Sequence, residues 1–370
     1  MVLGPRMARR TLLAAGLAVT AVGAAAAPAA ASVPRRLAAP DIAGTGDWEA
    51  RDPRGSIDVR GTAPDKIIVH HTATENAQDT SRAHAFALSR SIQDYHMDGN
   101  GWIDTGQNFT NSRGGHLTEG RHQSLAALRS GSEHVVGAHA GAQNAVSMGI
   151  ENEGTYTGAE VPAALWESLV ALCAYAVAQY GIAAGAIYGH RDYMATECPG
   201  EVLYGRLGEL REAVGAATGA AVVHPVTWPL LRPGASGPVV VALQRLLRAR
   251  GHEVAVDGVF GGATRRAAAG LAVPAEACYA APVAEAGLFG GTAWARLAPE
   301  LAAGDGGEAV RAAQVLLTAR GAAVAADGRF GSRTVAAVRD FQAARGLAVR
   351  GAVDGVTWRH LLGVSGAPAR

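Results

Sequence analysis

Residues 188–200 constrain the fold of this chain more than any other stretch, because they set a histidine and a cysteine on one irregular segment. The segment reads Tyr-Gly-His-Arg-Asp-Tyr-Met-Ala-Thr-Glu-Cys-Pro-Gly, with His190 eight positions before Cys198, in a chain that has only three cysteines. Imidazole nitrogen and thiolate sulfur are ligands that zinc prefers, and a catalytic zinc keeps three protein ligands and one open position. The segment therefore predicts two ligands of a metal site and requires a third from elsewhere.

The run Lys-Ile-Ile-Val-His-His-Thr at residues 66–72 is the best source of that third ligand. Its β-branched residues predict a short buried strand with two adjacent histidines at its carboxyl end, where open sheets carry their sites. Because side chains alternate along a strand, only one of His70 and His71 can face a metal. Spaced histidines and cysteines are common without a metal, but together the two segments supply the ligand types and number that zinc requires.

Four motifs in this chain follow one another as they do in a known family. They are Val-His-His-Thr-Ala-Thr, Gly-Ala-His-Ala-Gly-Ala-Gln-Asn, Ser-Met-Gly-Ile-Glu-Asn-Glu-Gly, and Gly-His-Arg-Asp followed by Thr-Glu-Cys-Pro-Gly. On these motifs residues 46–213 resemble the zinc-dependent N-acetylmuramoyl-L-alanine amidases that share a fold with peptidoglycan recognition proteins. The resemblance implies a Zn2+ ion held by His70, His190 and Cys198, with His71 left to packing or to support of a ligand.

The resemblance also suggests which groups would act beside the metal. Some family members carry a tyrosine where this chain has Gln107, whose amide cannot transfer a proton. Glu151 is the alternative base, because it matches the glutamate of a second amidase branch; it could instead be a solvated carboxylate, as we expect for Glu153. His139 matches an active-site histidine that could hydrogen-bond a developing oxyanion. Thr196 could contact the substrate carbonyl or only shape its loop.

The order of predicted elements indicates the fold class α/β mixed, with a central mixed β-sheet flanked by helices. Predicted strands cover 66–71 and 147–151, and two more flank the turn at 112–115. Helical spacing of apolar residues predicts a helix over 80–97, a second from Pro162 to about Tyr180, and a last one after Pro199.

The N-terminus, residues 1–31, is typical of a signal peptide. Arginines precede an apolar run at 12–22, and alanines end the segment before Ser32. We therefore expect export of the mature chain, by either the twin-arginine or the general secretory route. A membrane anchor is less favoured, because the run falls short of the ~20 residues that a spanning helix needs. No other segment is expected to span a membrane, and residues 32–45 are interpreted as an N-terminal arm.

Beyond a predicted linker at 214–229 the sequence repeats itself with a period of 70 residues. Repeat 1 covers 230–298 and repeat 2 covers 299–363. The matching pairs are Gly234/Gly304, Gln244/Gln314, Gly251/Gly321, Asp257-Gly258/Asp327-Gly328, Phe260-Gly261/Phe330-Gly331 and Thr264/Thr334. Each repeat resembles the all-α three-helix peptidoglycan-binding module.

The two repeats keep the pattern of that module unequally. Repeat 2 retains Phe341-Gln342 and Thr357-Trp358, whereas repeat 1 has Leu271-Ala272 and a six-residue excess before Trp294. Repeat 1 is therefore expected to be degenerate. For both repeats a purely structural role stays open, because Asp-Gly-x-Phe-Gly is in the first place a turn with an aromatic anchor.

The formal net charge is +1, but basic and acidic residues are distributed unequally along the chain. Residues 41–224 carry 12 Lys and Arg against 22 Asp and Glu, whereas residues 225–370 carry 16 arginines against 10 acids. The basic half suggests an anionic polymer as partner, or a solvated arginine face. Three cysteines form no disulfide framework; Cys173 is expected to be a buried free thiol, and a bridge to Cys278 is unmotivated. No nucleotide-binding fingerprint or other sign of a nucleic-acid partner is present.

These features predict a monomeric hydrolase, secreted and associated with the cell wall. It would cleave the amide bond between N-acetylmuramic acid and L-alanine of peptidoglycan, in cell wall degradation, while its C-terminal repeats bind the wall. One alternative is a peptidoglycan receptor without catalysis, although relatives that only bind typically lack the cysteine ligand that Cys198 supplies. The other is a zinc peptidase that cuts within the stem peptide.

Overall fold

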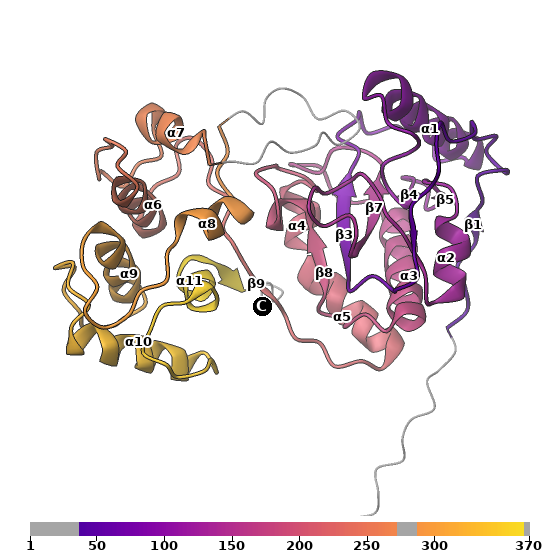
Figure 1. Ribbon diagram of the computed structural model, residues 1–370. Helices are drawn as coiled ribbons and strands as arrows, with labels where there is room; N and C mark the ends of the chain where they lie inside the picture. The colour runs from indigo at the N-terminus through magenta and orange to yellow at the C-terminus, as the bar shows by residue number, and fades with distance from the viewer. Residues whose placement is uncertain (1–36, 272–286, 366–370) are drawn as a thin grey trace, which may run out of the picture. The chain divides into compact units, whose positions relative to one another are not determined.

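The computed structural model describes residues 37–271 and 287–365 (Figure 1). The segment predicted to be a signal peptide and Cys278 lie outside the described residues.

A six-stranded mixed β-sheet with the strand order β1-β5-β4-β7-β3-β8 forms the centre of the N-terminal domain. Its strands are β1 (Ile42–Ala43), β3 (Lys66–His71), β4 (Phe109–Asn111), β5 (Leu117–Glu119), β7 (Ser147–Asn152) and β8 (Ile187–Gly189). Only β4 and β5 pair antiparallel, through the short turn that the sequence predicts; the other neighbours are parallel. The predicted mixed sheet is confirmed.

The core helices cover one face of this sheet, and the site lies on the other face. Ile67 and Val69 belong to the hydrophobic core that the sheet forms with α3 (Ala163–Tyr180) and α5 (Leu207–Thr218). Because side chains alternate along a strand, Ile68 and His70 point to the opposite face. The adjacent strand β7 follows the same rule, with Met148 and Ile150 in the core and Glu151 on the opposite face. The side chains of His70 and Glu151 therefore share the face away from α3 and α5.

The remaining elements of this domain are short. They are β2 (Val59–Arg60), α1 (Arg82–Asp94), a π-helical turn (Tyr95–Gly99), α2 (Ser124–Ser130), β6 (His134–Val135), a 3-10 turn (His190–Asp192) and α4 (Glu201–Gly205). The helix after Pro199 is thus broken into α4 and α5, and α5 continues to Thr218, into the range predicted as linker. Val214 is fully buried in the core, so the helix continues because its apolar side has a surface to pack on.

Helix α3 is long and apolar enough, by length and composition, to cross a membrane. Its residues Leu165, Leu169, Leu172 and Cys173 are fully buried in the core of the domain. The apolar character of α3 is explained by this packing. Cys173 is a free thiol, as the sequence predicts.

Among the described residues each C-terminal repeat contributes three helices, as expected. Repeat 1 has α6 (Pro238–Ala249), α7 (Gly262–Ala268) and α8 (Thr292–Leu297), and repeat 2 has α9 (Glu308–Ala319), α10 (Ser332–Ala344) and α11 (Gly355–Leu362). Strands β9 (Val226–Thr227) and β10 (Val364–Ser365) pair antiparallel. The buried apolar residues of the two repeats form one hydrophobic cluster, in which α6 packs against α9.

The repeated motif holds each repeat together. In repeat 2 the Gln314 amide donates to Asp327 Oδ1 (2.9 Å) and to Thr334 Oγ1 (3.0 Å) and accepts from the Gly328 N–H (2.9 Å). Gln244 makes the same contacts in repeat 1 with Asp257, Gly258 and Thr264. A buried amide that uses its donors and its acceptor fixes the turn it joins to the helix. These motif residues therefore have a structural role in each repeat, and their presence alone does not indicate ligand binding.

Candidate metal centre

The three predicted ligands meet at one edge of the sheet. His70 ends β3, His190 follows β8 directly, and Cys198 lies on the loop before α4. Their ligand atoms all lie within 4.8 Å of one another, and all three side chains are buried. Because β3 and β8 are neighbouring parallel strands, their carboxyl ends bring the two histidines together.

The electrostatics of the cluster suit a metal. Burial, and next the nearby His190, hold the pKa of His70 well below its usual value, and burial lowers the pKa of His190 to about 3. Both imidazoles are therefore neutral at pH 7, the form that a metal requires. The Cys198 Sγ atom lies 3.7 Å from His70 Nδ1 and accepts the His71 N–H at 3.3 Å, which orients the sulfur toward the histidine. Two neutral imidazoles and a cysteine fit the preferences of zinc.

His139 lies directly behind His70. His70 Nε2 is 3.0 Å from His139 Nδ1, and His139 Nε2 is 3.4 Å from the carbonyl oxygen of Ser147. A carbonyl can only accept, so His139 carries its hydrogen on Nε2 and accepts one from His70 Nε2 on Nδ1. The lone pair of His70 then sits on Nδ1, the atom that faces Cys198. Such a partner fixes the tautomer and ring orientation of a metal ligand.

Two glycines make room for the His139 ring. A Cβ atom at Gly137 would lie 2.6 Å from His139 Cδ2, and one at Gly149 would lie 2.5 Å from His139 Cγ. Any side chain at these positions would displace the ring. Both ring nitrogens of His139 already have partners, so this geometry favours a positioning role over the predicted contact with an oxyanion.

Glu151 lies beside His70, because the two residues are register partners on β7 and β3. Its side chain is buried, and burial raises the pKa of the carboxyl to about 8. Among the described residues its Oε2 atom has no hydrogen-bond partner. The alternative of a solvated carboxylate is inconsistent with this burial. A buried carboxyl with a lone pair to spare and a pKa near neutrality is typical of an acid–base group.

Gln107 occupies the neighbouring position on the same side. Its amide nitrogen donates to Thr110 Oγ1 at 2.8 Å, and Thr110 is the register partner of Glu151 on β4. Within the described part of the chain the Gln107 Oε1 atom also lacks a partner. This acceptor is placed to bind a donor group near Glu151, although it cannot transfer a proton.

The expectation that Glu153 is solvated was wrong. Glu153 is buried, and its carboxylate accepts from His84 Nε2 at 2.5 Å and from the Arg113 N–H at 2.7 Å. Helix α1 and the turn after β4 supply these donors, and the hydrogen bonds offset the cost of burying the charge. Sequence alone shows no link between His84 and Glu153, which are far apart in the chain.

The loop that carries Cys198 is fixed by its own side chains. Thr196 is buried, and its hydroxyl accepts the Cys198 N–H at 3.1 Å, so Thr196 shapes the loop; a contact with the substrate carbonyl stays a prediction. Asp192 was not singled out from the sequence. Its carboxylate accepts the Gly189 N–H (2.9 Å) and the Tyr204 hydroxyl (2.6 Å), which ties the turn at His190 to α4. The sequence signal that could have identified Asp192 is its position in the Gly-His-Arg-Asp motif.

Three parts of this chain match known protein families. Residues 60–201 match the family model described as N-acetylmuramoyl-L-alanine amidase. Residues 306–361 match a putative peptidoglycan binding domain, and residues 238–289 match a predicted peptidoglycan domain. The chain therefore carries one amidase-type domain and two peptidoglycan-binding domains.

Individual relatives cover the N-terminal domain. Peptidoglycan-recognition protein SC1a of Drosophila melanogaster is 32% identical over 162 residues, 44% of this chain and 80% of that relative. N-acetylmuramoyl-L-alanine amidase of Homo sapiens is 30% identical over 159 residues, 42% of this chain and 26% of that relative. Among solved structures, Drosophila PGRP-LB is 26% identical with a TM-score of 0.40, covering 50% of this chain and 98% of that structure. The chain belongs to the family of peptidoglycan recognition proteins and N-acetylmuramoyl-L-alanine amidases.

Proposed function

We propose that this protein is a secreted, zinc-dependent N-acetylmuramoyl-L-alanine amidase. Its substrate would be peptidoglycan, cleaved at the amide bond between the lactyl group of N-acetylmuramic acid and L-alanine. The observation that carries the proposal is the buried cluster of His70, His190 and Cys198 with the carboxyl of Glu151 beside it. The proposed enzyme domain is 46–213 together with β1 (Ile42–Ala43) and the end of α5 at Thr218. A linker up to 229 and the two repeats at 230–298 and 299–363 follow.

Different residues of the chain would have different roles in hydrolysis. His70, His190 and Cys198 would hold the metal, and zinc when bound polarises a carbonyl and acidifies water. Glu151 would accept the proton of the attacking water and return it to the nitrogen of the leaving L-alanine as the amide bond breaks. A carboxyl whose pKa lies near neutrality can do both. His139 would keep His70 in the tautomer that offers Nδ1 to the metal.

Glu151 also bears on the choice between an enzyme and a receptor. A buried carboxyl with an unpartnered oxygen lowers the stability of the fold. Proteins retain such unfavourable groups mainly at functional sites. A receptor without catalysis would gain nothing from Glu151 or from Cys198. We therefore favour catalysis over recognition alone, and the C-terminal repeats would hold the enzyme on the wall.

Mass spectrometry of the products from purified peptidoglycan tests the proposal. An amidase releases stem peptides with a free L-alanine amino terminus and leaves muramic acid with a free carboxyl group. A peptidase acting within the stem would instead leave shortened peptides on the glycan, and a receptor would release nothing. Activity should disappear with a chelator and return with zinc. Shortened stems, or cleavage that persists after the metal is removed, would refute this function.

A further inference from the structure

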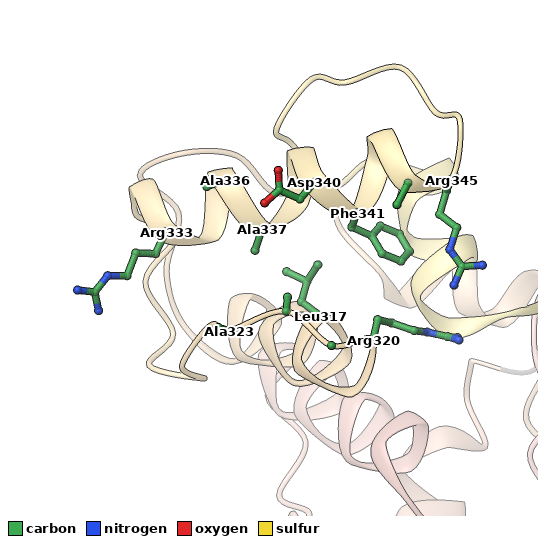
Figure 2. A pocket seen from close by; sticks show the side chains of 12 residues that line it. Leu317, Arg320, Ala323, Arg333, Ala336, Ala337, Asp340, Phe341 and Arg345 are labelled. Atoms are coloured by element: carbon green, nitrogen blue, oxygen red, sulfur yellow. The ribbon is translucent and has the colours of Figure 1, made fainter.

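Repeat 2 contains a groove between α9 and α10 that the repeated motif does not explain. It encloses about 690 Å³, a volume within the range of small-ligand sites (Figure 2). Leu317 reaches it from α9, Ala337 and Phe341 from α10, and Ala323 from the turn between the helices. Its inner surface is apolar and made largely of small side chains, so it admits a ligand with small substituents.

Arginines surround this apolar surface. Arg320 and Arg345 stand at one end of the groove, and Arg333 stands at the other (Figure 2). Arg320 is held in place by its donation to the carbonyl oxygens of Leu361 and Gly363, both at 3.0 Å. Arg345 lies with its guanidinium 5.5 Å from the centre of the Phe341 ring.

Within residues 37–271 and 287–365 these positive charges have no ion-pair partner. In the described residues no carboxylate forms an ion pair with Arg320, Arg333 or Arg345, and Asp340 is the one acidic residue that lines the groove. Two guanidinium groups at the same end of a groove repel each other, and a bound carboxylate would relieve that repulsion. The groove is therefore complementary to an anionic ligand with small apolar groups.

We propose that this groove binds the stem peptide of peptidoglycan through the peptide's carboxylates; the proposal rests on the wall-binding role inferred above. Stem peptides carry free carboxylates and the methyl side chains of alanine. The glycan strand is neutral, because the lactyl carboxyl group of its N-acetylmuramic acid is bound to the peptide in an amide. A sugar platform would need an exposed aromatic ring. The aromatic residues of repeat 2 are Phe330, Phe341 and Trp358, and all three are buried. The peptide is thus the better match in charge and shape.

Repeat 1 provides an internal contrast. One period earlier in the sequence, Arg266 stands at the position of Ala336, Glu253 at that of Ala323 and Leu271 at that of Phe341. Repeat 1 thus has a long charged side chain in place of a methyl group, and its glutamate, which lines the cavity beside the equivalent turn, would oppose a carboxylate. Peptide binding is therefore assigned to repeat 2 alone.

Pull-down of the full mature chain with purified sacculi tests this assignment. The Glu151→Gln background is used so that the sacculi stay intact. Ala336→Arg, which copies repeat 1, should lower binding about tenfold. Ala343→Arg is its control, because it adds the same side chain to an exposed position on α10 that does not line the groove. If binding depended only on positive charge, both variants would bind more strongly, and the assignment would be wrong.

A second pair of variants guards against misfolding. Arg345→Glu should weaken binding, whereas Arg339→Glu, an equal change in charge outside the groove, should not; thermal unfolding curves of all four must match the parent. Free stem peptide should compete for the sites that Ala336→Arg removes, and soluble glycan strands should not. Competition by glycan strands alone would overturn the assignment.

Turnover of a soluble muropeptide distinguishes the proposed groove in repeat 2 from the proposed amidase activity. With Glu151 restored, Ala336→Arg should cleave a soluble muropeptide as the parent does. If the parent protein shows no turnover, the proposed amidase activity is refuted, but a difference in wall binding between Ala336→Arg and Ala343→Arg would still support the groove. If turnover is normal and the two variants bind the wall equally, the groove proposal alone is refuted.

Discussion

His70 and Glu151 are register partners on two adjacent parallel strands, so the proposed metal ligand and the proposed acid–base group stand side by side on one face of the sheet. The arrangement is rigid, because β3 and β7 pair along their whole length, from Lys66 and Ser147 to His71 and Asn152. Groups held on strands keep their geometry better than groups on loops. The relationship suggests separate tests of the metal, the base and the residues behind them.

Glu151→Gln should lower kcat on the order of 10²–10⁴-fold, the usual contribution of a positioned acid–base group. The amide keeps the shape of the side chain but cannot accept a proton. Zinc content, measured by atomic absorption, should not change. Turnover near that of the parent would remove Glu151 from the mechanism.

The pH dependence of folding should reveal the same carboxyl. Burial raises the pKa of Glu151 to about 8 from 4.5, so the folded protein binds this proton more tightly than the unfolded chain. The corresponding stability is fully present below pH 4.5 and is lost as the pH rises through 8, by at most about 1.4 kcal/mol per pH unit. Denaturant unfolding of the metal-free protein should therefore show Glu151→Gln gaining on the parent between these values. A difference that stays constant with pH would show that the carboxyl is not perturbed.

Cys198→Ser should lose bound zinc and activity together, because a hydroxyl is a much poorer zinc ligand than a thiolate. Cys173→Ser is the control, since Cys173 is a buried free thiol in the core helix α3. Its zinc content should equal that of the parent, even if its stability falls. Full zinc occupancy in Cys198→Ser would contradict the ligand assignment.

Gly149→Ala should weaken zinc binding about 10- to 100-fold, the range seen when a group behind a metal ligand is disturbed. The added Cβ would collide with the His139 ring, which orients His70. Gly158→Ala is the matched control, because nothing lies within 4 Å of a Cβ at that position. Competition with a chromogenic chelator measures both affinities. Equal affinities would mean that His139 does not position His70.

Gln314→Ala should destabilise repeat 2 by about 1–3 kcal/mol, because it leaves the turn at Gly328 without its buried acceptor. The loss should appear in denaturant unfolding. Turnover of a small soluble muropeptide should be unchanged, since the ligands and Glu151 all precede residue 200. Unchanged stability would show that the repeated glutamine is kept for a purpose other than the fold.

The sequence by itself determined the chemistry that is local to short segments. The β-branched run at 66–71 specified a buried strand, and residue type and spacing predicted that His190 and Cys198 could both serve as metal ligands. The period of 70 residues specified two copies of one helical unit. These predictions needed no knowledge of which segments touch.

Only the tertiary structure decided what depends on contacts between distant segments. The hydrogen bond from His70 to His139, the burial of Glu153 against His84 and the extension of α5 to Thr218 each require a partner that the local sequence does not reveal. The groove of repeat 2 has the same origin. Its residues are mostly alanines and arginines that form no motif until α9 and α10 bring them together, because shape and unpaired charge are properties of a surface and not of a sequence pattern.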